Sequence, residues 1–234
     1  QNNRTSMSEN SVSNEQVLTS PLLVEQNSIY SKMLSDIINA VFVSGDRLVT
    51  TQLAERYNTS INPVREALKQ LQGEGFVNIA LNSGASVTKF EATNTRDVFE
   101  VLQLLDPYLM EWFVEEHSDE QRDELSEILS AMEKVALSAE PAHALYRHLD
   151  TQFHWLMYKD HYNKNAVELW RRNRLILHVA HASLTLSKRR IEQSISEHRT
   201  LLQNLEKRDV GKTLKTLKAH IANSGRYWSR YQVR

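Results

Sequence analysis

Apolar residues recur at helical spacing along much of the chain. Between residues 27 and 45, for example, Ile29, Met33 and Ile37 are four apart, which is the spacing of one face of an amphipathic helix. The same spacing returns after Thr93 and predicts helices over 98–114, 119–137, 142–158, 166–186, 189–207 and 210–227. Because the connections between them are short, these helices are expected to form an antiparallel bundle.

The segment from Leu48 to Phe90 is organised differently. A short helix is predicted over 51–57, followed by a polar turn and a second helix from Asn62 to about Gln72. Two stretches rich in strand-forming residues follow, 76–79 and 86–90, with turn residues between them. A helix, a tight turn, a second helix and a hairpin are typical of a winged helix-turn-helix, which puts its second helix in the DNA major groove.

The second helix of this unit has one apolar face, from Val64 to Leu71, and one polar face around Arg65. A solvated face on an ordinary helix would show the same pattern, but the flanking turn, first helix and hairpin favour DNA binding. The candidate DNA contacts lie on the polar face, near the two helix starts and on the wing: Arg47, Thr50, Ser60, Ile61, Asn62, Arg65, Lys69, Ser83 and Gly84. Ser60 is also suited to cap the second helix.

Composition sets the broad class of protein. The chain has 234 residues and no Cys, which excludes a disulfide framework and a thiolate metal site. No apolar run is long enough to span a bilayer and no export segment is evident, so a cytoplasmic protein without membrane contact is expected. Residues 1–26 are rich in Asn, Ser, Gln and Thr and are predicted to be a flexible tail.

Charge is distributed unevenly although the net charge is −1. Residues 91–158 contain four Lys or Arg and fifteen Asp or Glu, whereas residues 159–234 contain seventeen and six. The favoured interpretation is that the two halves lie against each other in one domain. The other, a basic face for nucleic acid, lacks the interspersed aromatic residues of single-strand binders.

Four polar residues in the predicted bundle suggest a metal site. Asp150 and His154 are four apart on one helix, His198 lies in the apolar stripe of another, and His220 lies near the edge of a third stripe. Buried imidazoles need partners, and one divalent ion would satisfy all four groups. Three imidazoles and a carboxylate suit zinc or nickel. The alternative is a core His198 bonded to a backbone carbonyl and a surface pair of Asp150 with His154.

The helix-turn-helix motifs resemble a known family. Gly45, Leu53-Ala54, Ser60-Ile61-Asn62-Pro63-Val64-Arg65-Glu66-Ala67-Leu68 and Gly75-Phe76-Val77 resemble the signature of the GntR superfamily of bacterial transcription regulators. Ile61-Asn62 replaces the Arg-Thr pair common in that family, and Ser44 replaces a Pro, so a different operator is expected. The resemblance implies a winged helix-turn-helix of three helices and a β-hairpin wing over residues 27–90. It also implies a homodimer that binds a palindromic double-stranded DNA operator, and we interpret it as a repressor.

The predicted bundle, residues 91–234, resembles the effector-sensing FCD (FadR C-terminal) domain, an all-helical domain of six or seven helices. That domain carries an Asp-x-x-x-His, a Glu-His-Arg and a late Ala-His pattern, which match Asp150 to His154, Glu197 to Arg199 and Ala219-His220. The resemblance implies the same four metal ligands and a small-molecule effector. Leu102 stands where many FCD domains have an Arg.

The replacement of that Arg leaves the effector open. A carboxylate could bind through the metal itself, helped by Arg171, Arg172 or Arg174, and His178 is a further candidate effector residue. Otherwise His178 and His181 are expected to pack in the core or to support the metal ligands. Two further hypotheses use the same metal cluster. One is a metal-dependent hydrolase or oxygenase, for which no general base is placed by a motif. The other is a structural metal without an effector.

Overall fold

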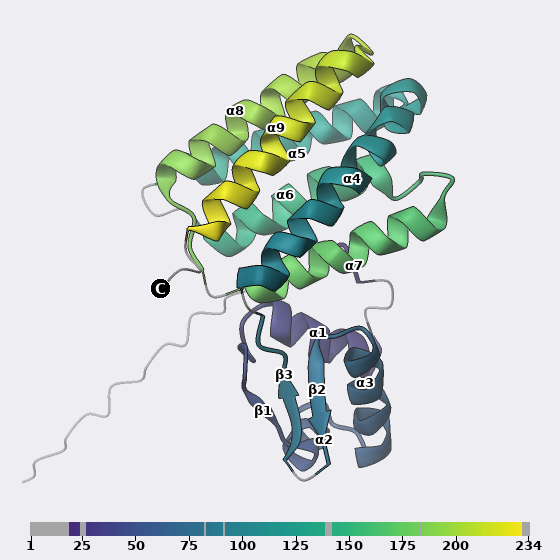
Figure 1. Ribbon diagram of the computed structural model, residues 1–234, viewed down its shortest axis with the longest axis vertical. Coiled ribbons are helices and arrows are strands. Elements are labelled where there is room, and N and C mark those ends of the chain that lie inside the picture. Colours follow the sequence, from purple (N-terminus) through teal and green to yellow (C-terminus); the bar gives the residue numbers. More distant parts are fainter. Residues whose placement is uncertain are drawn as a thin grey trace, which may run out of the picture.

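The protein is described by a computed structural model over residues 19–23, 27–81, 83–90, 92–138, 142–182 and 184–230. Within these residues, a head of three helices and a small sheet lies at one end of a bundle of six helices (Figure 1). This confirms the predicted mainly α fold, with a winged helix-turn-helix followed by an all-α bundle. None of the described helices has both the length and the apolar character needed to cross a membrane.

The head begins with α1 and continues through the helix-turn-helix into the wing. Its elements are α1 (Ile29–Ile38), β1 (Arg47–Leu48), α2 (Thr50–Arg56), α3 (Ile61–Gly73), β2 (Val77–Ala80) and β3 (Gly84–Val87). The expected hairpin is present, but β1 extends it into an antiparallel sheet of order β1-β3-β2. In α3 the positions predicted to face the core are buried, and α1 packs across them. Burial of each such aliphatic side chain contributes about 1.5–3 kcal/mol.

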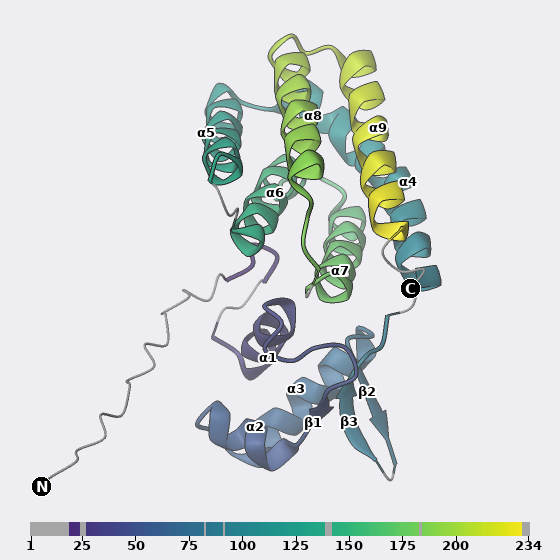
Figure 2. The same cartoon turned by 90° about the vertical axis from the view of Figure 1, so that its left-hand side faces the viewer.

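The bundle contains the six predicted helices. They are α4 (Ala92–Glu116), α5 (Asp119–Ala136), α6 (His143–Tyr158), α7 (Lys164–Ala180), α8 (Lys188–Glu206) and α9 (Val210–Ser229). Helix α4 packs against α9, α7 and α6, while α5 packs against α6 and α8, and α8 against α9 (Figure 2). Arg199 of the basic half pairs with Glu133 of the acidic half, which agrees with the two halves lying against each other.

Two helices end earlier than their apolar patterns predict. Helix α1 ends at Ile38, because Ala40 has a φ of 59° that no helix continues through, and Val41 is exposed. Helix α7 ends at Ala180 and not at residue 186. The cause is a tertiary contact: the Arg147 guanidinium donates to the carbonyl oxygens of Ala182 and Leu184 and holds that segment outside the helix.

The head meets the bundle along α1 and α7 (Figure 2). Arg172 of α7 donates to the backbone oxygen of Glu74 at 3.0 Å. Residues 19–23 also belong to this joint: Leu22 is fully buried, and its carbonyl accepts a 2.9 Å hydrogen bond from Arg171. For these five residues the structure differs from the predicted flexible tail. The rest of that tail, residues 1–18 and 24–26, lies outside the described residues.

Candidate metal centre and DNA-binding face

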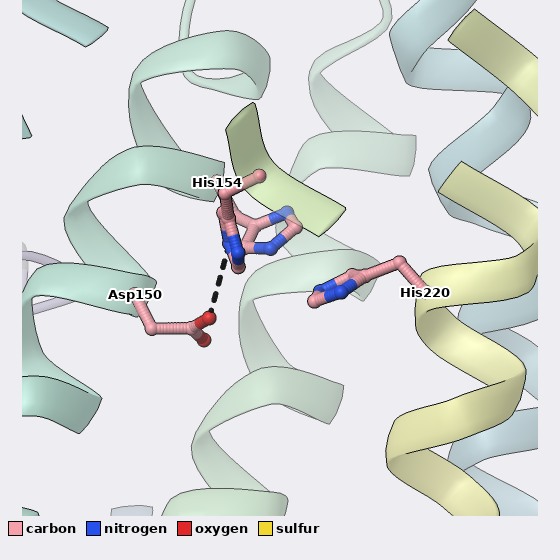
Figure 3. A group of neighbouring side chains, drawn as sticks. Asp150, His154 and His220 are labelled. Atoms are coloured by element: carbon pink, nitrogen blue, oxygen red, sulfur yellow. Dashed lines mark ion pairs between the residues drawn. The ribbon is translucent and has the colours of Figure 1, made fainter. Parts of the chain in front are cut away.

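Four candidate metal ligands from three helices meet inside the bundle. Asp150 and His154 come from α6, His198 from α8 and His220 from α9, and one possible ligand atom of each lies within 4.8 Å of the others. Figure 3 shows Asp150 and His154 pointing toward His220 across the bundle interior. Each of the three imidazoles is at most 4% exposed. The structure thus brings together all four residues that the sequence pattern suggested.

Hydrogen bonds to two of the imidazoles define their tautomers. Nδ1 of His198 lies 2.7 Å from the backbone oxygen of Ser194. A carbonyl oxygen only accepts, so Nδ1 carries the proton and Nε2 keeps its lone pair. Nδ1 of His220 lies 2.7 Å from Oε2 of Glu197 in the same way. Burial alone would raise the pKa of Glu197, but the hydrogen bond and charge of His220, with Arg190, lower it to about 2, so this carboxylate accepts.

These contacts are the usual support for a metal-binding histidine. A ligand imidazole normally donates its other ring N–H to a carbonyl or carboxylate, which fixes the ring and directs the free lone pair at the metal. The sequence alternative for His198, a core histidine bonded to a backbone carbonyl, is therefore compatible with a ligand role. The other part of that alternative is wrong, because His154 is 1% exposed and does not form a surface pair.

The protonation states also fit a divalent ion. Burial holds the pKa of His154 well below its usual range, and neutral imidazole is the form that binds metals. Burial would raise the pKa of Asp150, but the charge of Arg174 and the His198 imidazole, whose Nε2 lies 3.2 Å from Oδ1 of Asp150, hold it well below its usual value. Neither ring nitrogen of His154 has a hydrogen-bond partner in the described part of the chain, and Nε2 of His198 makes no hydrogen bond there although it lies 3.2 Å from Oδ1 of Asp150. Such atoms are costly to bury, so the cluster is suited to hold a metal ion.

A cavity of about 80 Å³ lies directly beside the cluster. Its lining includes Arg174 and His178, two of the predicted effector residues. The Arg174 guanidinium pairs with the Asp150 carboxylate, and its Nε has no partner within the described chain. Burial, with the charges of Arg174 and Arg147, lowers the pKa of His178 to about 3. The cavity wall therefore combines a permanent cation with a neutral imidazole.

Another predicted effector residue, Arg171, points elsewhere. Its guanidinium is held by Glu168 and by the carbonyl of Leu22, so it lies at the joint with the head and does not line the cavity. Sequence reasoning missed Arg190, Arg147 and Tyr146, which do line it. A signal for Arg190 exists: it precedes His198 by eight residues, two helical turns, and so shares its face. Arg147 gives no such signal: it lines the cavity, and its guanidinium is held by the carbonyl oxygens of Ala182 and Leu184, far along the chain.

The predicted DNA contacts of α3 lie on its solvent-facing side. Ile61, Asn62, Arg65 and Lys69 are all exposed. Lys69 forms a 3.0 Å ion pair with Glu66, whereas Arg65 makes no ion pair with any described residue. Ser60 occupies the N-cap position as predicted, but its side chain makes no capping hydrogen bond.

The remaining candidates surround the start of α3. Arg47 is exposed on β1, Thr50 is the half-buried first residue of α2, and Ser83 and Gly84 are exposed where β3 begins. Gly84 has a φ of 78°, a left-handed conformation that favours glycine at this turn. The sequence did not single out Leu81, whose side chain is fully exposed on the same turn. In Figure 1 this turn and α2 lie at the end of the head away from the bundle.

A head of this geometry beside a sensor-like bundle defines a two-domain DNA-binding regulator. Residues 97–223 match the family model of the FCD domain, and residues 25–87 match that of the bacterial regulatory proteins of the gntR family. The chain therefore belongs to the GntR family, in the group whose members carry an FCD domain. Such proteins are transcription regulators that bind DNA and small-molecule effectors, and they are not enzymes. The hydrolase or oxygenase alternative is set aside on this ground.

Two relatives bear the names of transcription regulators. The chain is 24% identical over 192 residues to the uncharacterized HTH-type transcriptional regulator YdhC of Bacillus subtilis (strain 168), covering 82% of this chain and 85% of that protein. It is 25% identical over 171 residues to the gluconate operon transcriptional repressor of Bacillus licheniformis, covering 73% and 68%. Both names support a transcription regulator.

Solved structures support the fold. E. coli McbR/YncC superposes with a TM-score of 0.74 at 19% identity, covering 91% of this chain and 100% of that one. A GntR regulator from Rhodococcus sp. RHA1 superposes with a TM-score of 0.68 at 17% identity, covering 88% and 97%. At these identities the likeness concerns the fold alone.

Proposed function

We propose that this protein is a repressor whose affinity for a palindromic operator is controlled by a small anionic effector, bound at or beside a divalent metal ion. The observation that carries the proposal is the buried cluster of Asp150, His154, His198 and His220, with ring nitrogens that lack partners and a cavity at its side. The winged head supplies the output, because the family binds DNA through it.

The four residues of the cluster would hold the metal ion. Three neutral imidazoles and one carboxylate suit zinc or nickel, and they leave a position for an oxygen of water or of the effector. When bound, the metal would supply a Lewis-acidic site at the cavity wall. The hydrogen bonds from His198 to Ser194 and from His220 to Glu197 would keep the two rings oriented toward it.

A carboxylate is the effector group that best fits the rest of the cavity. Leu102, which stands where many FCD domains have an Arg, is 2% exposed and supplies no charge. Positive charge comes instead from Arg174 of α7 and Arg190 of α8, both on the cavity wall. An anion on the metal would lie close to the Arg174 guanidinium, which pairs bidentately with carboxylates at low cost in side-chain freedom. The cavity's small volume favours a small acid.

The head would bind DNA as one half of a symmetric dimer. Two copies related by a two-fold axis would put two α3 helices into successive major-groove segments, which matches a palindromic operator. Arg65 supports this role because its guanidinium is exposed and unpaired in the described structure. Arg47, Thr50, Ser60, Lys69, Ser83 and Gly84 would contact the backbone around it.

Metal content and operator affinity, measured on the same preparations, test the proposal. Wild-type protein is expected to bind about one zinc or nickel ion per chain, and a small carboxylate should change operator affinity only when the metal is present. His220→Ala should reduce the affinity for the metal by more than the roughly 10–100-fold that is typical for loss of a residue that only supports a ligand. The effect of the carboxylate on operator affinity should be lost with it. Elemental analysis and fluorescence anisotropy give the two readouts.

His181→Ala is the matched control, because His181 is 4% exposed like His220 and lines the same cavity, but it is not part of the cluster. This variant should keep the metal. Equal metal loss in both variants, or no metal bound by wild-type protein, would contradict the proposed site. If the metal binds but no carboxylate changes operator affinity, the ion has a structural role only. That result would contradict the proposed control of DNA binding by an effector.

A further inference from the structure

An apolar side chain occupies a solvent-exposed position at the start of α3. Ile61 is the first residue of the helix and is 37% exposed. The core-facing side of α3 is already formed by its buried residues Val64, Ala67, Leu68 and Leu71. Ile61 therefore contributes only part of its surface to the head's core, and the remainder faces the same side as Arg65, one helical turn further along.

The side chains on either side of Ile61 are also exposed. The Ser60 side chain makes no capping bond, and Asn62 is exposed beside it. Two other basic side chains of the head are engaged in ion pairs: Arg56 pairs with Asp36 at 2.7 Å and Lys69 with Glu66 at 3.0 Å. The four residues Ser60, Ile61, Asn62 and Arg65, here termed the reading tip, thus share one solvent-facing end of α3. This end follows α2, away from the bundle (Figure 1).

We infer that Ile61 is a specificity residue that selects thymine in each operator half-site. The inference rests on the proposed DNA binding by α3 and adds the base that one side chain recognises. An isoleucine side chain has neither a charge for a phosphate nor a hydrogen-bonding group for a base edge. The feature of the major groove that matches it is the C5 methyl group of thymine, which the minor groove does not present.

The other residues of the reading tip complete the expected half-site. Asn62 suits adenine, because its amide can donate to N7 and accept from the N6 amino group. Arg65 suits guanine, whose O6 and N7 accept two hydrogen bonds from one guanidinium. The half-site is therefore expected to combine a thymine, an adenine and a guanine within the short stretch spanned by one turn of helix.

Removing a single methyl group from the DNA tests the role of Ile61 directly. Full-length protein is used to select an operator from a random double-stranded pool, and each thymine is then replaced singly by deoxyuridine. Burial of one methyl group is worth about a fourfold change in affinity. One thymine per half-site should show a loss of about this size with wild-type protein. With Ile61→Ala, the same replacement should have no effect, although overall binding is weaker.

Ile79→Ala is the matched control. Ile79 is 38% exposed, belongs to the same head and lies on strand β2 and not on α3. This variant should remain as sensitive as wild-type protein to loss of the methyl group at the critical thymine. A further variant, Ile61→Arg, should shift the preferred base at that position from thymine to guanine in a repeated selection. Circular dichroism checks that all three variants keep the helical content and melting behaviour of the parent protein.

The outcomes separate this inference from the proposed function. If the operator is bound but no thymine is sensitive, or if Ile61→Ala stays sensitive at the same thymine, the assignment of Ile61 is wrong while DNA binding stands. If no sequence is enriched and wild-type protein binds no duplex, the proposed DNA binding fails and this inference fails with it. Loss of sensitivity in Ile61→Ala alone supports the assignment.

Discussion

Asp106 is a buried acid that the metal site does not use. It is 4% exposed on α4 and accepts hydrogen bonds from the Tyr158 hydroxyl at 3.0 Å and from Nε1 of Trp170 at 3.2 Å. Burial raises its pKa to about 6, although the charge of Arg174 and the two hydrogen bonds act in the opposite direction. The carboxyl group therefore holds its proton more tightly in the folded protein than in the unfolded chain.

This residue gives the free energy of unfolding a predictable pH dependence. Its contribution is fully present below about pH 4, where both states are protonated, and is lost as the pH rises to about 6. A shift of this size corresponds to a cost on the order of 3 kcal/mol above pH 6. Asp106→Asn cannot ionise, so its stability relative to wild-type protein should rise across that interval. Urea unfolding at several pH values between 4 and 8 measures the free energy of unfolding of both proteins. If the difference between Asp106→Asn and wild-type protein does not change with pH, the prediction is wrong.

At the scale of elements, α7 touches both the head and the metal site. Glu74 is the C-cap residue of α3. Its backbone oxygen accepts hydrogen bonds from Nε of Arg172 at 3.3 Å and from Nη2 of Arg172 at 3.0 Å. Two residues further along, Arg174 pairs with Asp150 of the metal cluster. A shift of α7 caused by a ligand near Arg174 would therefore reach the recognition helix through Arg172.

Arg172→Ala is expected to uncouple the two sites. Metal and carboxylate affinities should stay near their wild-type values, while the change in operator affinity caused by the carboxylate should fall from the usual 5–150-fold range of such couplings toward one. Isothermal titration and fluorescence anisotropy on the same preparation measure both quantities. Arg189→Ala, at an exposed arginine of α8, is the control and should respond normally. An unchanged response in Arg172→Ala would rule out this route.

At the scale of the whole molecule, the metal cluster joins three helices of the bundle. Asp150 and His154 belong to α6, His198 to α8 and His220 to α9. Without an ion, the two buried ring nitrogens of His154 lack hydrogen-bond partners among the described residues, which lowers the stability of the folded state. A bound ion stabilises the folded state by mass action, because the unfolded chain does not assemble the site.

Metal removal should therefore lower the melting temperature of the protein. Dialysis against a chelator followed by differential scanning fluorimetry measures the change, and one equivalent of zinc or nickel should restore the original value. Magnesium should not restore it, because this ion prefers oxygen ligands in an octahedral arrangement. Equal recovery with magnesium, or no change on chelation, would contradict a metal bound by the three histidines.

The local features of both sites were predictable from the amino-acid sequence. Helical spacing placed Asp150 and His154 on one face of a helix and His198 within an apolar stripe. In the structure Asp150 and His154 lie on α6, and His198 is buried. The polar face of the recognition helix around Arg65 was predictable for the same reason. Such features depend on the period of a single helix and on residue type, and both are visible in a short window of sequence.

Which of these local features meet in space depends on the packing of the helices. The packing of α6, α8 and α9 brings His220 to the metal cluster, and it brings Arg190 to the cavity wall. The contact with residues 19–23 directs Arg171 of α7 to Leu22 and away from the effector cavity, and the contacts of Arg147 of α6 lie where α7 ends early. These outcomes depend on contacts between segments far apart in the chain, and helical spacing carries no information about the partner that a side chain finds across an interface.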